Sequence, residues 1–358
     1  MRQMQSLIGT KSIPLISAVD LFCGAGGLTH GLLKSGINVC SGVDIDPKVK
    51  YAYEHNNTGA KFYCWDVGTT PTEDFKKLFV DSKYKLLAGC APCQPFSKLT
   101  QLSGKHPSWN MLDHFGRLIE AIQPDLVTME NVPELGKKGA DVFEKFKRVL
   151  LDNAYYVDWK IINCADYGVP QSRHRLVLLA SKLGSISIPD GRYVGKWKTV
   201  RDAVGDLPLV MAGNVDQVDR LHRARKLSPL NLKRIQATPH NGGTRSAWPK
   251  ELLPDCYKRK TGDSYKTIYG RMWWDKPAPT MTTLCTGLGN GRFGHPDQDR
   301  SITLREAALF QSFPKGYQFW NEEPFNHAAV SRMIGNAVPP QLSKIIGRTL
   351  VEHLSSLK

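Results

Sequence analysis

The chain has 358 residues, of which 41% are hydrophobic and 23% charged, so it can bury a core and is long enough for one large and one smaller folding unit. Its 48 Lys and Arg residues against 33 Asp and Glu give a formal charge of +15, which suits a polyanionic partner, although a generally basic enzyme would show the same excess. Eight scattered cysteines, no apolar run near ~20 residues and no signal-peptide pattern in residues 1–14 exclude a disulfide scaffold and a transporter, and predict a protein of the reducing cytoplasm.

Three short apolar runs near the start of the chain predict strands. Residues 15–22 (LISAVDLF) lead into a glycine-rich turn at 23–27, after which leucines recur at helical spacing. A second strand, 39–44, ends on an acidic residue, and a third, 61–65, is followed by another. This order of strand, tight turn and helix is typical of nucleotide-binding α/β proteins.

Further strands and amphipathic helices alternate beyond this point. Strands are expected at 84–89, 126–129 and 176–180, and helices at 115–122 and 142–151. Alternation of this kind predicts a mostly parallel sheet with crossover helices.

The regular alternation ends near residue 182, where Gly, Pro, Trp and basic residues take over. Residues 184–300 hold 20 Lys and Arg against 11 Asp and Glu, so +9 of the total charge of +15 lies in this stretch. We expect a second, irregular unit here. Turn residues at the start of 334–354 then lead into a helical pattern that we expect to return to the first unit.

The first three strand ends predict a nucleoside pocket. Gly24, Gly26 and Gly27 allow a sharp turn and a close approach to a ligand, but their spacing is not the dinucleotide pattern, which favours a cofactor without a pyrophosphate. Asp44 stands where an acid binds ribose hydroxyls, and Asp66 could accept from an adenine amino group. An acid of this kind, taken alone, is more often a turn or cap residue, and the convergence of three strand ends favours the pocket.

The Cys90-Ala-Pro-Cys93 segment follows the fourth strand and allows three interpretations. Zinc would need a second Cys or His pair at ligand spacing, and the other six cysteines are single. A redox dithiol would need a thioredoxin-like context. The third interpretation is a single nucleophilic thiol, Cys93, in a loop stiffened by prolines. On that interpretation Cys93 is essential and Cys90 nearly dispensable.

An acid and two arginines are expected at the same edge of the sheet. Glu130 follows the fifth strand, although it could be a helix-capping acid. Arg173 and Arg175 precede the last strand on one side of an extended chain, because their spacing is two. A thiol, an acid and paired arginines from separate strand ends form a candidate active site.

Seven motifs occur in order along the chain, and together they resemble the DNA (cytosine-5) methyltransferases of the bacterial modification type. The motifs are DLFCGAGG (20–27), GVDIDP (42–47), CAPCQPFS (90–97), MENV (129–132), QSRHR (171–175), TLREAALFQSFP (303–314) and GNAVPP (335–340). One such motif is weak evidence, whereas seven in order are highly specific.

The resemblance implies an α/β fold: a Rossmann-like class I S-adenosylmethionine-dependent methyltransferase domain, with a mostly parallel twisted sheet, and a smaller irregular target-recognition domain. The implied domains are a catalytic and cofactor-binding domain at 1–183, a target-recognition domain at 184–300, and a hinge with a C-terminal return at 301–358. The cofactor would be S-adenosyl-L-methionine, leaving as S-adenosyl-L-homocysteine, and no metal would be required.

The resemblance also assigns roles to residues. Cys93 would be the nucleophile, Glu130 the acid at cytosine N3, and Arg173 and Arg175 the pair that supports the base at O2 and the neighbouring geometry. The cofactor pocket would be lined by Phe22, which packs against the adenine, with Gly24, Ala25, Gly26, Gly27, Asp44, Ile45, Asp66, Val67 and Asn336. DNA contacts are expected from Ser97, Lys98, Lys105, Arg271 and Thr282.

The implied chemistry suits these residue types. Cytosine C5 is too electron-poor to attack a methyl sulfonium, but addition of a thiolate at C6 makes C5 nucleophilic, and an acid at N3 offsets the charge that addition creates. The thiolate must approach the ring from its face, so the cytosine has to leave the duplex. The loop at 97–114 would close over the DNA. This family usually carries an arginine in that loop where the chain has Ser108-Trp-Asn-Met111, which puts one phosphate contact in doubt.

Two alternatives to a DNA methyltransferase remain at this point. A tRNA-methylating branch shares the core motifs, but the long basic segment 184–300 favours groove reading in double-stranded DNA. A non-catalytic relative would be expected to lack Cys93 or Glu130, and both are present. We further expect a monomer without membrane contact in the bacterial cytoplasm or nucleoid. A cognate restriction endonuclease would act on the same site without binding the enzyme.

Overall fold

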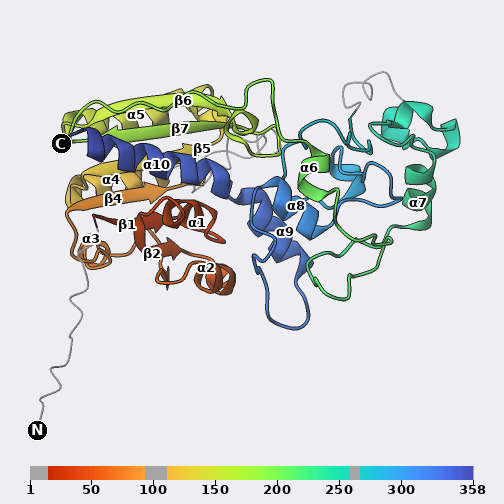
Figure 1. Ribbon diagram of the computed structural model, residues 1–358, viewed down its shortest axis with the longest axis horizontal. Helices are drawn as coiled ribbons and strands as arrows, with labels where there is room; N and C mark the ends of the chain where they lie inside the picture. The colour runs from red at the N-terminus through yellow and green to blue at the C-terminus, as the bar shows by residue number, and fades with distance from the viewer. Residues whose placement is uncertain (1–14, 93–110, 259–266, 358) are drawn as a thin grey trace, which may run out of the picture.

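The computed structural model describes residues 15–92, 111–258 and 267–357, and its core is a seven-stranded sheet (Figure 1). The strand order is β3-β2-β1-β4-β5-β7-β6, and β7 runs antiparallel to both of its neighbours while the other pairs are parallel. The strands are β1 (Ile16–Leu21), β2 (Asn38–Asp44), β3 (Lys61–Cys64), β4 (Tyr84–Gly89), β5 (Leu126–Asn131), β6 (Tyr156–Asn163) and β7 (His174–Ser181). The predicted α/β class with a mostly parallel sheet is confirmed.

Strand β6 is the one that the sequence did not predict. It lies at the edge of the sheet, and most of its residues are half-buried, so its sequence (YVDWKIIN) has neither a clear alternation nor a continuous apolar run. A short connection at 164–173 joins it to β7, which is the geometry of antiparallel neighbours. The six predicted strands are all present within a few residues of their expected bounds.

Helices cover both faces of the sheet. Helices α1 (Gly27–Leu33) and α10 (Pro340–Ser356) pack on one face, and α3 (Thr72–Lys76), α4 (Met111–Ile122) and α5 (Ala140–Asp152) pack on the other. The side chains of β1 point to both faces of the sheet. Ile16 and Ala18 pack in the core beneath α1 and α10, whereas Val19 and Leu21 pack in the core beneath α3, α4 and α5. Helix α2 (Lys50–Asn56) follows β2.

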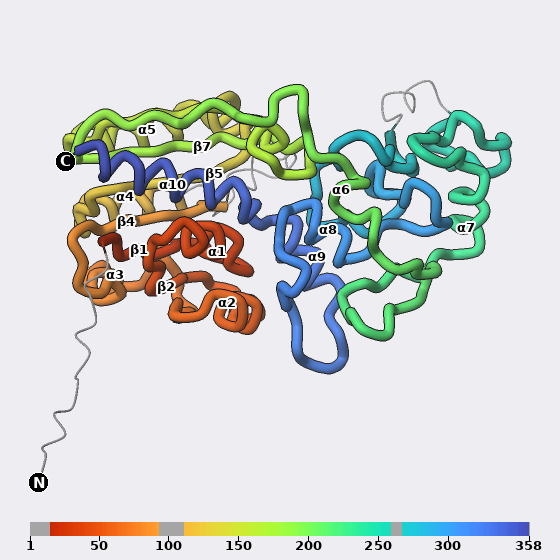
Figure 2. The backbone as a smooth tube through the Cα atoms, viewed as in Figure 1, coloured from red at the N-terminus to blue at the C-terminus, as the bar shows by residue number. Residues whose placement is uncertain are grey.

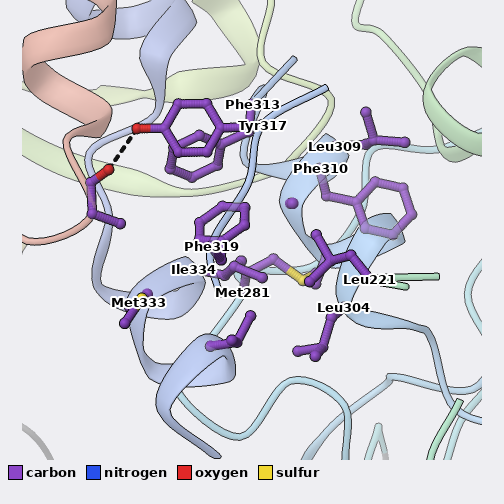
Figure 3. Close-up of a cluster of buried hydrophobic side chains, with 14 of the residues drawn as sticks. Leu221, Met281, Leu304, Leu309, Phe310, Phe313, Tyr317, Phe319, Met333 and Ile334 are labelled. Atoms are coloured by element: carbon purple, nitrogen blue, oxygen red, sulfur yellow. Dashed lines mark hydrogen bonds between the residues drawn. The ribbon is translucent and has the colours of Figure 1, made fainter. Parts of the chain in front are cut away.

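A second lobe with little regular structure follows β7 (Figure 2). Its helices are α6 (Val200–Val204), α7 (Pro229–Gln236), α8 (Leu304–Phe310) and α9 (His327–Asn336). A third hydrophobic cluster, which includes Phe313 and Tyr317, fills it (Figure 3). The cluster reaches the first lobe, because Tyr53 and Phe62 also belong to it. The Tyr317 hydroxyl also donates a hydrogen bond to the Ala25 carbonyl. The two lobes are therefore joined through a continuous core.

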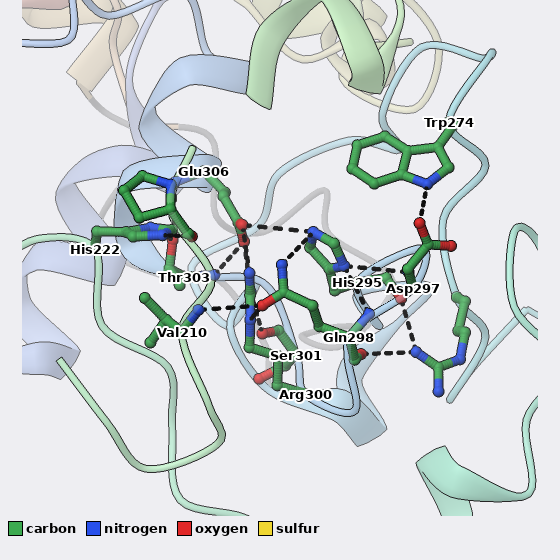
Figure 4. A network of polar contacts seen from close by, with 12 residues as sticks. Val210, His222, Trp274, His295, Asp297, Gln298, Arg300, Ser301, Thr303 and Glu306 are labelled. Atoms are coloured by element: carbon green, nitrogen blue, oxygen red, sulfur yellow. Dashed lines mark hydrogen bonds and ion pairs between the residues drawn. The ribbon is translucent and has the colours of Figure 1, made fainter. Parts of the chain in front are cut away.

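A buried ion pair organises the start of α8 (Figure 4). Both terminal nitrogens of Arg300 contact the carboxylate of Glu306, at 2.7 and 2.8 Å, and both side chains are buried. The same carboxylate accepts from the Thr303 backbone N–H at 2.7 Å, which completes a capping box. Burial alone would raise the pKa of Glu306, but Arg300 outweighs it and lowers that pKa to about 2.

Arg271 has an internal role, which corrects its expected place at the DNA surface. Its side chain is fully buried, and its guanidinium donates to the backbone carbonyls of Ile235, Thr238 and His295 and pairs with Asp299. A guanidinium whose donors are already bound inside the lobe cannot reach a phosphate or a base edge. Arg271 therefore holds the loops of the second lobe together.

Within the described ranges, no helix is long and apolar enough to cross a membrane.

Helix α10 packs closely against α1 of the first lobe (Figure 1). A Cβ atom on Gly31 would lie 2.3 Å from the Ser343 Cβ and 2.4 Å from the Pro340 carbonyl oxygen. Gly27, at the start of α1, is equally confined, since its Cβ would lie 2.3 Å from the Val338 carbonyl oxygen. Only glycine allows the two segments to touch in this way.

We predict that Gly31→Ala destabilises the protein although alanine favours helix formation by about 1 kcal/mol. The added methyl group has to push α10 away from α1, at a cost of roughly 1–3 kcal/mol or more. Gly116→Ala in α4 is the matched control, because its Cβ would make only an ordinary contact, 3.5 Å from Val149. Thermal or urea unfolding should show a loss for Gly31→Ala and a small gain for Gly116→Ala. A gain for both would contradict the packing described here.

Candidate active site

A cavity of about 560 Å³ opens at the carboxyl ends of β1, β2, β4 and β5, next to the end of α9. Eleven residues that the sequence predicted for the cofactor pocket or for catalysis line it: Phe22, Gly24, Ala25, Asp44, Ile45, Asp66, Val67, Glu130, Arg173, Arg175 and Asn336. Ligands of open α/β sheets bind at this edge, because the loops after parallel strands converge there.

The glycine-rich turn after β1 is held by Asp44, at the end of β2. One Asp44 carboxylate oxygen accepts from the Gly24 N–H at 2.9 Å, and the other accepts from the Asp46 N–H at 2.9 Å. Phe22 and Gly24 have φ of 57° and 50°, and a Cβ on Gly24 would meet no protein atom within 4 Å. The turn therefore presents open space to a ligand. Gly26 and Gly27 shape the start of α1 and do not line the cavity.

Asp66 lies in the loop after β3, and its side chain caps that loop. Its Oδ1 accepts a hydrogen bond from the Gly68 N–H at 2.7 Å. Trp65, which the sequence analysis did not single out, lines the cavity beside it. Its position directly before Asp66, a predicted cofactor residue, could have indicated that it lines the cavity.

Asp20, the first residue of the DLFCGAGG motif, is a buried acid for which the sequence predicted no role. The Thr29 hydroxyl donates to its Oδ2 at 2.7 Å, whereas Oδ1 has no hydrogen-bond partner in the described part of the chain. Burial, and to a smaller extent the charge of Asp44, raises the pKa of Asp20 to about 7. Asp20 lines the cavity, so its unsatisfied oxygen is suited to a cationic or hydrogen-bond-donating group of a ligand.

Glu130 is buried at the other side of the cavity, between a cation and a hydrogen-bond donor. Its Oε1 lies 2.8 Å from Arg175 Nε, and its Oε2 accepts from the Cys90 thiol at 2.9 Å. The neighbouring Asn131 side chain donates to the Ala91 carbonyl at 3.0 Å, which ties the loop after β4 to β5. The carboxyl group is therefore fixed in orientation by two contacts, one from β7 and one from the loop after β4.

The contact with Cys90 changes one expectation. Cys90 was expected to be nearly dispensable, but its thiol donates a hydrogen bond to the Glu130 carboxylate, which also forms an ion pair with Arg175. The position of Cys90, three residues before Cys93, gave no indication of a partner 40 residues away.

Arg173 ties the cavity to the second lobe. Its terminal nitrogens donate to the Met281 carbonyl at 2.8 Å and the Gly335 carbonyl at 3.0 Å, and its Nε has no partner among the described residues. Burial first, and then the charge of Arg175, lowers the pKa of Arg173 to about 9. Both terminal nitrogens expected at the target base are therefore bound to the main chain, and Nε is the nitrogen that has no partner among the described residues.

The remaining predicted residues lie elsewhere. Thr282 is exposed and does not line the cavity, but its backbone packs against Gly335, which does. Cys93, Ser97, Lys98 and Lys105 lie outside the described residues. Arg332 and Met333 of α9 line the cavity and were not predicted, since the motif that follows them gives no signal for the preceding helix.

A glycine-rich turn, an acid at the end of β2 and a buried acid with arginines at the ends of β5 and β7 together form the candidate active site of an α/β enzyme. The sequence model described as C-5 cytosine-specific DNA methylase matches residues 16–352 of this chain. The chain therefore belongs to the C-5 cytosine-specific DNA methylase family, and the predicted resemblance is confirmed.

Individual relatives agree with this assignment. The chain is 46% identical over 343 residues to the Type II methylase M.HgiDII of Herpetosiphon aurantiacus, covering 95% of this chain and 96% of that protein. It is 31% identical to the Type II methyltransferase M1.HphI of Haemophilus parahaemolyticus, covering 94% and 87%. Among solved structures, S. pombe Dnmt2 methyltransferase superimposes with a TM-score of 0.65 at 19% identity, covering 95% of this chain and 99% of that chain, which supports the fold alone.

We predict that the stability difference between Asp20→Asn and the unmodified protein depends on pH. The folded protein keeps a proton on Asp20 up to about pH 7, whereas the unfolded chain loses it near 3.8. The cost of the buried charge is therefore absent at low pH, grows as the pH rises and is complete above about 7. Relative to the unmodified protein, Asp20→Asn should gain on the order of 2 kcal/mol between pH 5 and pH 8.

Unfolding in denaturant at several pH values measures this difference. Asp152→Asn, at an exposed position, is the control and should show no such trend. A constant difference between Asp20→Asn and the unmodified protein over this range would mean that Asp20 is ionised throughout.

Proposed function

We propose that the protein transfers the methyl group of S-adenosyl-L-methionine to C5 of a flipped-out cytosine in a specific duplex DNA sequence, through a covalent bond between Cys93 and cytosine C6. The observation that carries the proposal is that one cavity holds both sets of predicted residues. Asp44 and the glycine-rich turn line one side of it, and Glu130 with Arg175 lines another. A methyl donor and a base that share a cavity can react without leaving the protein.

The residues on the first side fit the proposed cofactor. Asp44 stands where ribose hydroxyls can donate to it, Phe22 offers a ring face to the adenine, and the space at Gly24 admits a ligand against the backbone. The unsatisfied Oδ1 of Asp20 suits the ammonium group of the methionine portion. When bound, S-adenosylmethionine supplies an electrophilic methyl group and leaves as S-adenosylhomocysteine.

The residues on the other side would act on the base. The Cys93 thiolate adds to C6 and forms a C–S bond, and the electron pair of the C5–C6 double bond becomes available at C5 for the methyl group. Glu130 donates a hydrogen bond or a proton at N3 as negative charge develops there, and Arg175 holds its carboxyl group in place. A base then removes the C5 proton, and the returning electron pair expels the thiolate. Arg173 would contact O2 through its remaining Nε.

The second lobe would read the DNA. Residues 184–300 carry a net charge of +9, and we propose them as the target-recognition domain, between a catalytic domain at 1–183 and a hinge with the C-terminal return at 301–358. Ser97, Lys98, Lys105 and Thr282 are proposed DNA contacts. The similarity to two Type II methylases supports a modification enzyme of a restriction system. We propose that it works in the bacterial cytoplasm as a monomer.

We predict that the protein transfers tritium from labelled S-adenosylmethionine to unmethylated duplex DNA and not to tRNA. Cys93→Ala should reduce labelling to background while cofactor binding persists, because the nucleophile is lost and the cofactor residues remain. Labelling of tRNA instead of DNA would support an RNA methyltransferase. Labelling by Cys93→Ala would exclude the covalent mechanism.

Cys90→Ala in the same assay should lower kcat by about tenfold, which corresponds to the loss of one hydrogen bond of roughly 1.5 kcal/mol to the Glu130 carboxylate. KM for DNA should not change, since Cys90 holds an acid and not the duplex. Cys64→Ala, at an exposed position, is the matched control. A loss as complete as that of Cys93→Ala would favour a dithiol mechanism.

A further inference from the structure

A second cavity, of about 200 Å³, lies beside the first one. It is lined by polar and basic side chains from three separate stretches: Arg225, Thr283, Thr286, His327, Ser331 and Arg332. Arg332 lines both cavities, so the two are neighbours on α9. None of these six residues was predicted to act in binding or catalysis.

The charge of this cavity is not balanced by the protein. The ion pairs of arginines in the described ranges involve Arg175, Arg201, Arg220, Arg271, Arg300 and Arg305, and leave out Arg225 and Arg332. Both of these side chains are exposed, and both line the cavity. Arg223 adds a further positive charge nearby, stacked 3.9 Å from the centre of the Phe325 ring. Two arginines that no carboxylate neutralises are suited to an anion.

His327 provides an independent observation. Both of its ring nitrogens are buried, and neither has a hydrogen-bond partner in the part of the chain that the structure describes. Burial, and then the charges of Arg225 and Arg223, lowers the pKa of His327 to about 4, so the ring is neutral at pH 7 and carries one N–H group. A buried donor without an acceptor is destabilising, and an accepting ligand would relieve that cost.

We propose that this cavity binds a phosphate group of the DNA backbone next to the flipped nucleotide, an inference that rests on the proposed duplex substrate. Arginines, a neutral histidine N–H and threonine hydroxyls are all donors, and the oxygens of a phosphodiester are all acceptors. Arg332 faces both cavities, so a phosphate held here is adjacent to the nucleotide that enters the larger cavity. The phosphate would keep the strand in register while the base is out of the duplex.

The salt dependence of DNA binding tests this site. Duplex affinity is measured with S-adenosylhomocysteine over a series of sodium chloride concentrations for the unmodified protein, Arg225→Gln and Arg348→Gln. Arg225→Gln should flatten the plot of log K against log salt by about 0.9, the value for one lost phosphate contact. Arg348→Gln, an exposed arginine on α10, should keep the original slope. Equal slopes in all three proteins would overturn the proposal.

A second variant separates this role from a structural one. His327→Leu removes both ring nitrogens and should weaken DNA binding without lowering the melting temperature, because those nitrogens have no hydrogen-bond partner among the described residues. Unchanged DNA affinity in His327→Leu would count against the site.

A second arm distinguishes the DNA backbone from free anions. Inorganic phosphate is compared with chloride at equal ionic strength in thermal unfolding. Stabilisation of the unmodified protein but not of Arg225→Gln, together with an unchanged DNA slope, would mean a site for free anions and overturn the proposal. Failure to methylate DNA would refute the proposed function, while the binding slopes would still decide this site.

Discussion

The close contact between the start of α1 and residues 337–343 is the constraint on which the cavity depends. Gly27 and Gly31 have no side chains, so the backbone after α9 can lie directly against α1. After α9 the chain leaves the second lobe. The contact with α1 places this part of the chain at the edge of the sheet where the parallel strands end. Asn336 and the last turn of α9 reach the cavity for this reason. The second lobe is thereby anchored at both of its ends on the first.

Buried charges then divide the cavity into two chemically different sides. Asp20 and Asp44 make one side acidic, and burial raises the pKa of both carboxyl groups. A hydrogen-bond donor or a cation of a ligand would stabilise their charged forms. On the other side, Glu130 is matched by Arg175, and Arg173 extends the positive charge toward the second lobe. A cationic methyl donor and an electron-poor base would therefore meet different electrostatic surroundings within one cavity.

Much of this arrangement could be predicted from the sequence, because strand ends in a parallel sheet converge whatever lies between them. Phe22, Asp44, Asp66 and Glu130 each follow a readable strand, and the structure brings all four to the cavity. Contacts between side chains of distant segments could not be predicted in this way. The pairing of Cys90 with Glu130 depends on side-chain directions that only the folded sheet fixes.

The second lobe was less predictable for a related reason. This lobe is held together by buried polar contacts between loops and has few periodic helices. The local sequence around a basic residue therefore does not indicate whether its side chain is buried or exposed. Arg271 lies among backbone carbonyls, whereas Arg225 borders an open cavity. The edge strand β6 was missed because a half-buried strand shows no clear alternation.

A trapped covalent adduct would test the central claim most directly, namely that one cavity brings a methyl donor and a cytosine to Cys93. The substrate is duplex DNA in which every cytosine is replaced by 5-fluorocytosine, so that C5 cannot lose a proton after methylation. The account predicts a protein–DNA complex that survives denaturation, forms only with S-adenosylmethionine and is absent in Cys93→Ala. An adduct that persists in Cys93→Ala, or methylated DNA without any adduct, would contradict it.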